Sequence, residues 1–145
     1  MAGKYGPSSV AITLDDDQGG TSRTITPYVQ TIGGIKVEQI SEEVSPFGVA
    51  YDKHSPIGKQ RVPDIPIGGF FDTTATSGPH VVFGTPDDLP TDGTTTTSRT
   101  FTFTPGDSKV FTMECILVSY EVMSVTDKLS RFSGVLRQAG AGAWA

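Results

Sequence analysis

The chain has 145 residues and a net charge of −5, with acidic and basic residues scattered along its length. That length fits a single domain spanning residues 1–145, and no apolar stretch approaches the roughly 20 residues of a membrane-spanning helix, so we expect no membrane partner. Lys and Arg form no concentrated block that would grip nucleic acid, so the protein either avoids DNA or lets DNA pass without adhesion.

Residue usage predicts the all-β class. Glycine, threonine and proline are frequent, and strong helix formers are few. Threonine is β-branched and fits a pleated surface, whereas glycine and proline mark turns. Short strands between frequent turns are typical of a β-sandwich or barrel.

The first third of the chain contains three predicted strands. Residues 1–9 contain no apolar run of the kind found in secretory signals, so we expect no such signal. Residues 10–14 alternate apolar and polar side chains and end in an acidic turn. Residues 24–28 form a second strand, which Pro27 places at an edge or near a bulge. A glycine pair then breaks the chain before a third strand at residues 35–40.

Periodicity is lost over residues 41–61, which predicts a long extended loop. Irregular connections longer than about 12–15 residues are uncommon in compact domains and usually have a function. Phe47, Val49, Tyr51 and Ile57 make this segment too apolar for a solvated linker. We therefore expect another surface to cover them, which can belong to another molecule.

Strand patterning returns at residues 62–72. Pro63 and Pro66 each remove a backbone donor, so a full ladder on both sides is expected only from about Ile67. Residues 78–83 can open a short helix with a proline in its first turn. The polar, threonine-rich stretch 87–98 is predicted to be a surface loop.

The strongest pattern is a hairpin in the last third. Residues 99–104 alternate strictly, residues 105–107 turn, and residues 109–122 form a long strand. One face of this strand carries Phe111, Met113, Cys115 and Leu117, and the other carries Val110, Ile116, Val118, Tyr120 and Val122. Both faces are apolar in the middle, so we expect that part to be buried on both sides or covered by a partner. Residues 128–138 fit a helix or a strand, and residues 139–145 form a flexible C-terminal arm with Trp144.

No pattern in the sequence indicates catalysis. His54 and His80 are the only histidines, and Cys115 lies among apolar neighbours, where a small buried side chain is the ordinary interpretation. A lone cysteine also fits folding in a reducing cytoplasm. The acidic turn at residues 15–18 lacks the spacing and the closing glutamate of a calcium loop. We therefore expect no enzyme activity, no cofactor and no metal.

Two blocks of sequence, covering about half of the chain, resemble the tail tube (major tail) proteins of long-tailed bacteriophages. The resemblance is carried by Ser41-Glu42-Glu43, Phe47-Gly48, His54-Ser55-Pro56-Ile57-Gly58, Pro63-Asp64-Ile65, Gly68-Gly69-Phe70-Phe71-Asp72, the Thr-Phe-Thr-Phe-Thr hairpin, Glu114 to Glu121 and Gly134 to Gly140. Members of this family are β-sandwiches of two packed sheets with a short flanking helix and a long loop. The resemblance also favours a strand over residues 128–138.

The resemblance implies a structural virion protein that polymerises as stacked, hexameric rings into the tube that conducts DNA during ejection. Residues 41–61 would be the inter-ring stacking loop. The implied contacts between copies are Phe47, Val49, Tyr51, His54, Ile57 and Trp144. Other implied partners are the tape measure, tail terminator and baseplate or tip proteins, and passing DNA that is not bound specifically. Assembly in the host cytoplasm and a place in the virion tail follow.

Repeated acidic side chains would repel DNA phosphates along the tube wall. Glu38, Glu114 and Glu121 are the candidates for this role, although strand parity leaves open which face lines the channel. Two alternatives remain: another virion structural subunit, such as a capsid-decorating or tail-terminating protein, and a carbohydrate-binding β-sandwich.

Overall fold

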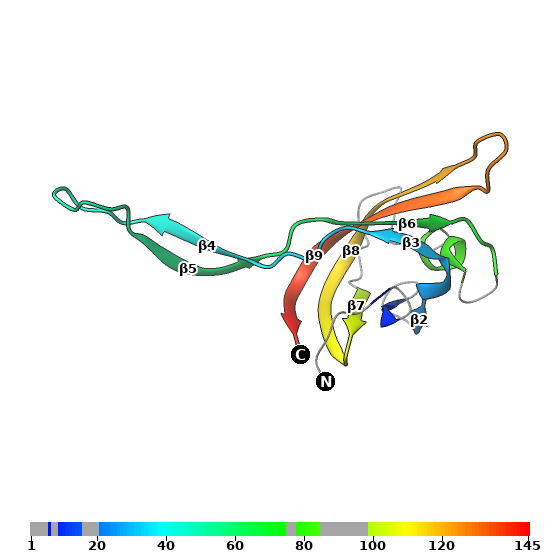
Figure 1. Cartoon of the computed structure of the whole chain (residues 1–145), viewed down its shortest axis with the longest axis horizontal. Coiled ribbons are helices and arrows are strands. Elements are labelled where there is room, and N and C mark those ends of the chain that lie inside the picture. Colours follow the sequence, from blue (N-terminus) through cyan, green and yellow to red (C-terminus); the bar gives the residue numbers. More distant parts are fainter. Residues whose placement is uncertain (1–5, 7–8, 16–20, 75–77, 85–98) are drawn as a thin grey trace, which may run out of the picture.

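A computed structural model describes residues 6, 9–15, 21–74, 78–84 and 99–145, and consists mainly of two antiparallel sheets (Figure 1). The larger is a curled seven-stranded sheet with strand order β2-β1-β7-β8-β9-β6-β3, and the smaller is the ribbon β4-β5. The strands are β1 Ala11–Asp15, β2 Ser22–Thr24, β3 Val29–Ile32, β4 Glu38–Glu43, β5 His54–Arg61, β6 Ile65–Phe70, β7 Arg99–Gly106, β8 Lys109–Met123 and β9 Arg131–Trp144.

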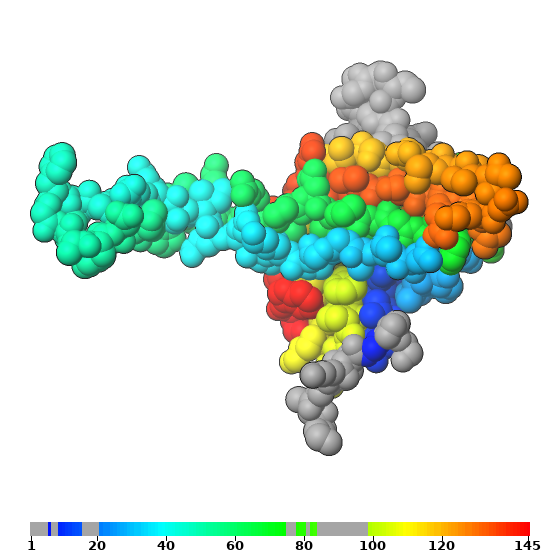
Figure 2. Space-filling view, turned by 45° about the horizontal axis from the view of Figure 1, so that its top comes forward, coloured from blue at the N-terminus to red at the C-terminus, as the bar shows by residue number. Residues whose placement is uncertain are grey.

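The predicted all-β class is confirmed, and the curled sheet fits the partial-barrel form of that prediction. The second sheet differs from the prediction because it extends away from the body instead of packing on the first sheet (Figures 1 and 2). Of the predicted flanking helix the structure describes one π-helical turn, η4, at His80–Gly84. The predicted loop at 87–98 and the turn after Asp15 lie outside the described residues.

The hydrophobic core lies on one face of the seven-stranded sheet. It consists of Ile12, Leu14, Ile25, Val62, Ile65, Ile67, Val82, Phe83, Phe101, Phe111, Met113, Cys115, Leu117, Phe132 and Leu136. The predicted buried face of β8 is therefore confirmed, including Cys115. The opposite face is only partly covered: Ile116 is half-buried and Val118 is exposed.

A bulge changes the side-chain parity near the middle of β8. Leu117 pairs with Leu136 and Ser119 pairs with Val135, so β8 has one extra residue, Val118, between two consecutive partners on β9. Beyond this point Tyr120 packs on the core and stacks on the rings of Phe83 and Phe132. The prediction that Tyr120 shares a face with Val118 is wrong, because sequence alternation does not reveal a bulge.

The predicted strand at 24–28 is also corrected. β2 ends at Thr24, and residues Thr26–Tyr28 form a 3₁₀ turn, η3, because Pro27 cannot donate to a strand ladder. This turn lies close against β6, where a Cβ atom at Gly69 would overlap the carbonyl of Tyr28. The next predicted strand begins at Glu38 instead of residue 35.

The prediction that Pro63 and Pro66 delay the full hydrogen-bond ladder of β6 until about Ile67 is confirmed. β6 pairs with β9 from Ile65, whereas its pairing with β3 reaches only to Ile67, opposite Ile32. The turn between β7 and β8 lies one residue later than predicted. Asp107 and Ser108 both have positive φ, 53° and 60°, as a two-residue type I′ turn requires.

The C-terminal residues form a strand and not a flexible arm. β9 confirms the strand that the resemblance favoured over 128–138, and it continues to Trp144, opposite Phe111. The amide of Ala145 donates to the carbonyl of Val110 (2.8 Å). Small residues permit this pairing: a Cβ atom at Gly142 would lie 2.9 Å from the ring of Phe111.

Candidate assembly interface

The ribbon formed by residues 38–61, called the arm below, extends from the body as a two-stranded hairpin (Figure 1). Its register runs from Glu38 opposite Arg61 to Glu43 opposite His54, with a shift after Ile40. The prediction of an irregular loop over 41–61 is therefore wrong. Because nearly all side chains of the arm are exposed, selection for alternating apolar residues is absent and no strand period appears in the sequence.

Large apolar side chains of the arm have no cover within the described chain. Phe47, at the turn of the hairpin, is fully exposed, and Tyr51 is 69% exposed. Val44, Val49 and Ile57 are exposed as well. An isolated two-stranded hairpin is marginally stable in water, and exposed apolar clusters usually mark interaction surfaces. The arm therefore has the properties of a segment that another surface completes.

Charge pairs hold the base of the arm. Nε and Nη2 of Arg61 both donate to Oε2 of Glu38 (2.9 and 2.7 Å), and Nζ of Lys36 lies 2.8 Å from the other oxygen of Glu38. Hydrogen bonds from Lys36 and then Arg61 hold the pKa of Glu38 below its usual value. Both cations favour the ionised form of Glu38, one of the predicted channel acids, and together they outweigh its single negative charge.

A set of amide hydrogen bonds, called the Gln60 clamp below, fastens the arm to β9. Nε2 of Gln60 donates to the carbonyl of Gly142 (2.6 Å), and the amide of Gly142 donates back to Oε1 of Gln60 (2.9 Å). Gln138 adds a bond from its Nε2 to Oε1 of Gln60 (3.1 Å) and accepts one from the amide of Val62 (2.9 Å). The side chain of Gln60 thus takes the place of a neighbouring strand on β9. Gln60 and Gln138 were not recognised from the sequence, because such amide pairs follow no periodicity.

A second apolar surface lies where β8 turns into β9. We call residues 118–129 the β8–β9 end, and its exposed apolar members are Val118, Val122, Met123, Val125 and Leu129. The two strands are joined across their base by the hydroxyls of Ser124 and Ser130 (2.6 Å). This hairpin end and the arm lie at opposite ends of the molecule (Figure 1). No sequence pattern identified the β8–β9 end as a contact surface.

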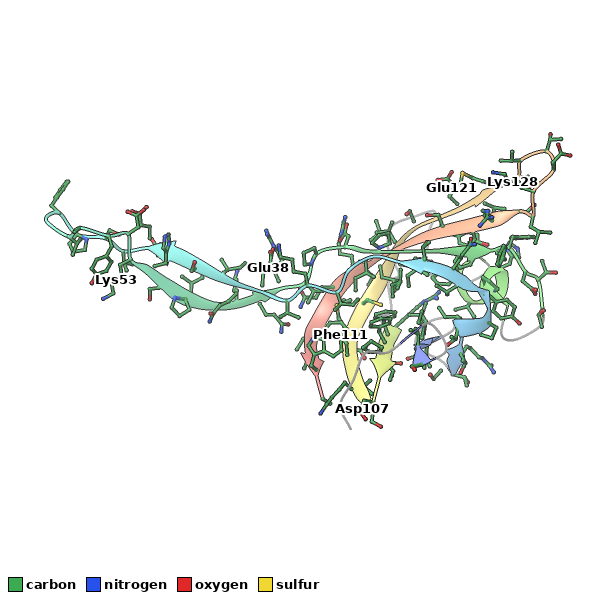
Figure 3. The ribbon with its side chains drawn as sticks, in the orientation of Figure 1. Glu38, Lys53, Asp107, Phe111, Glu121 and Lys128 are labelled. Atoms are coloured by element: carbon green, nitrogen blue, oxygen red, sulfur yellow. The ribbon has the colours of Figure 1, made fainter. Side chains whose placement is uncertain are left out.

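The remaining predicted residues do not gather at one place. Trp144 packs on Phe111 with ring centroids 5.4 Å apart and stays half exposed at the end of β9. Glu114, in the middle of β8, accepts a hydrogen bond from the hydroxyl of Thr100 (2.5 Å). Glu121 lies toward the far end of β8, well separated from Glu38 (Figure 3). Their contact and channel roles therefore remain predictions.

Two negative observations concern the described ranges. Nowhere in them do three or more His, Cys, Asp or Glu side chains lie close enough together to hold one metal ion. None of the helices in these ranges has the length and apolar character needed to cross a membrane.

Comparisons with known proteins show where this fold occurs. No protein-family model matches the sequence, and no curated protein matches it at a significant level. A chain in the tail of an empty GTA particle, solved by helical refinement with C6 symmetry, matches with a TM-score of 0.70 and 14% identity, over 99% of each chain. A chain in the sixfold-symmetrised baseplate of the anti-feeding prophage matches with a TM-score of 0.74 and 9% identity, over 100% of this chain and 97% of that one.

A chain in the virion of the native gene transfer agent (GTA) particle matches with a TM-score of 0.64 and 14% identity, over 97% of this chain and 98% of that one. These matches span the whole chain, so they concern the arm and the body together. At this level of identity they establish the fold. The chain therefore has the fold of these tail, baseplate and virion chains, which confirms at the level of the fold the resemblance to phage tail proteins predicted from its sequence.

Proposed function

We propose that this chain is a structural subunit of a phage-type tail tube, which polymerises with copies of itself into stacked, sixfold rings. The observation that carries the proposal is the arm: a projecting hairpin with Phe47 and Tyr51 exposed, on a domain whose fold recurs in sixfold tail and baseplate structures. The proposed role is passive, without catalysis or a cofactor. Its place is the virion tail, assembled in the host cytoplasm.

The energetics favour polymerisation over a free subunit. Burying a phenylalanine or a similar side chain contributes about 1.5–3 kcal/mol relative to leaving it exposed. The exposed side chains of the arm repeat in every copy, so their burial is repeated along the polymer. Interfaces of permanent assemblies commonly bury 2,000 Å² or more in total. A projecting arm can contribute to such an area because both of its faces are exposed.

The negative net charge of the chain is compatible with a tube through which DNA passes. Each copy contributes a net charge of −5, and an acidic wall repels phosphates instead of retaining them. Lys36 and Arg61 both pair with Glu38, whereas Glu114 and Glu121 have no ion pair with any of the described residues, so these two are the better candidates for this wall. Tape measure, terminator and baseplate or tip proteins would contact the ends or the interior of such a tube.

The test is the assembly state of the purified chain. Sedimentation velocity and negative-stain microscopy should find rings or tubes whose amount rises with concentration. Phe47→Glu should leave a folded monomer that does not polymerise, because a charge at the fully exposed turn touches none of the core. Phe47→Leu, which keeps an apolar side chain, is the matched control and should polymerise. Tubes of normal length from the glutamate variant would contradict the role of the arm.

One other function has a specific observation in its favour. The baseplate match covers the whole chain with a TM-score of 0.74, so a subunit of a single ring at one end of a tail is the second candidate. Stable closed rings that never stack, or trimers, would favour this terminal or decorating role. A carbohydrate platform has less support, because Tyr28, Tyr51 and Trp144 lie on η3, the arm and β9 and share no strand face.

A further inference from the structure

Exposed large apolar side chains are not spread evenly over the described residues. One group belongs to the arm and its base, a second belongs to the β8–β9 end, and Trp144 stands apart. The two groups are Val37, Val44, Phe47, Val49, Tyr51 and Ile57 on the first, and Val118, Val122, Met123, Val125 and Leu129 on the second. The two hairpins that carry most of these side chains, the arm and the β8–β9 end, extend toward opposite ends of the molecule (Figures 1 and 3).

Symmetry restricts what the arm can meet. Copies related by rotation around a tube axis, or by translation along it, make head-to-tail contacts, in which a patch meets a different patch of the next copy. An arm turn that met the same arm turn of a partner would close a twofold dimer and stop growth. The arm therefore needs a second apolar surface on the same chain. Among the described residues the largest such group outside the arm is the β8–β9 end.

We propose that the arm turn of one copy, residues 44–51, docks on the β8–β9 end of another copy. This inference rests on the proposed polymer and adds the receiving surface, which consists of Val122, Val125 and Leu129 together with their neighbours. The occupant is a second copy of this chain, because one kind of subunit must supply both halves of each repeated contact.

The charges around both surfaces are compatible with this contact. Asp52 and Lys53 follow the arm turn, and Asp127 and Lys128 lie in the turn of the β8–β9 end. Each turn thus has an acid next to a base, so an opposed pairing of the two turns adds attraction. Glu121, the other acid of the β8–β9 end, lies on β8 outside that turn. Trp144 is a weaker receiver, since it is a single side chain whose ring already packs on Phe111.

Cross-linking between separately prepared variants tests the contact. Phe47→Cys and Leu129→Cys are purified apart, and a size tag distinguishes them. They are then mixed, polymerised and treated with a short bismaleimide. Both positions are well exposed, so neither change touches the core, and Cys115 is fully buried and protected from the reagent. Lys109→Cys, exposed at the opposite end of β8, replaces Leu129→Cys in the control mixture.

The expected result is a tagged–untagged dimer that links positions 47 and 129, identified by peptide mass, and at least tenfold less product with position 109. Assembled polymers in which position 47 links to position 109, or to neither, would overturn the receiving surface and leave the proposed polymer intact. Wild-type protein that forms no polymer would overturn the proposed function, and this inference with it. Phe47→Lys mixed with Leu129→Glu gives a second readout, because polymerisation lost in each variant alone should return in the mixture.

Discussion

The Gln60 clamp gives a quantitative prediction about how the arm is held. Replacing Gln60 with alanine removes its hydrogen bonds to the carbonyl and amide of Gly142 and the bond from Gln138. It leaves the fold of β9 and the pairs between Glu38 and Arg61 in place. The arm should then lose its fixed angle to the body while its own strands stay paired.

The size of the effect follows from those bonds. A protein hydrogen bond contributes a net 0.5–1.5 kcal/mol, roughly, and a buried backbone group left unpaired costs about 1–3 kcal/mol. Gly142 is buried, but the site is only part-buried as a whole, so water can reach some of the released groups. We expect Gln60→Ala to lower the free energy of unfolding by about 2–3 kcal/mol. For a domain of this size that corresponds to a fall in Tm of about 5–10 °C.

Urea denaturation of the monomeric Phe47→Glu background measures this without interference from polymerisation. Gln39→Ala is the matched control, because Gln39 is the exposed cross-strand partner of Gln60 on the same ribbon. Surface changes of that kind usually stay within about 0.5 kcal/mol. A Gln60 variant as stable as the Gln39 variant would refute the clamp.

Two further predictions concern the body. Arg99 is fully buried and donates from Nη1 to the carbonyl of Val82 (2.6 Å). Urea denaturation should therefore find that Arg99→Met lowers the free energy of unfolding by about 3 kcal/mol. A loss below about 1 kcal/mol would contradict this prediction. Hydrogen bonds from Arg137 hold the pKa of Asp64 below its usual value. The pair therefore stabilises the fold above the pKa of an unfolded Asp, and this contribution is lost as the pH falls through the lower pKa of the folded state. In Arg137→Met, NMR titration should find the pKa of Asp64 back in its ordinary range; an unchanged pKa would contradict this.

Local chemistry made much of the body predictable from sequence. Alternation over β7 and the first half of β8 reports a strand with one buried face, and Phe111, Met113 and Leu117 lie there as expected. Pro66 marks where β6 gains its second neighbour, because a proline has no amide to donate. In these segments a local property, either burial of alternate side chains or the missing amide of a proline, decides the structure, and both properties can be read from the sequence.

The arm and the β8–β9 end were harder to predict because their large apolar side chains are exposed and do not pack into the core. Neither strand of the arm has a buried face in the single chain, so no period-two pattern marks it as a hairpin. The bulge after Leu117 and the clamp formed by Gln60 depend on contacts between distant residues, which spacing cannot reveal. The apolar residues of the arm and the β8–β9 end can be seen in the sequence, but the sequence does not say which surface would cover them.

The proposed tube depends on completion of the arm by another copy of the chain. Electron cryo-microscopy of the assembled protein tests this most directly. We predict sixfold rings in which Phe47 and Tyr51 of every copy lie buried against a different copy, with the β8–β9 end beneath them. A chain that remains monomeric at high concentration, with the arm folded back on its own body, would contradict the account.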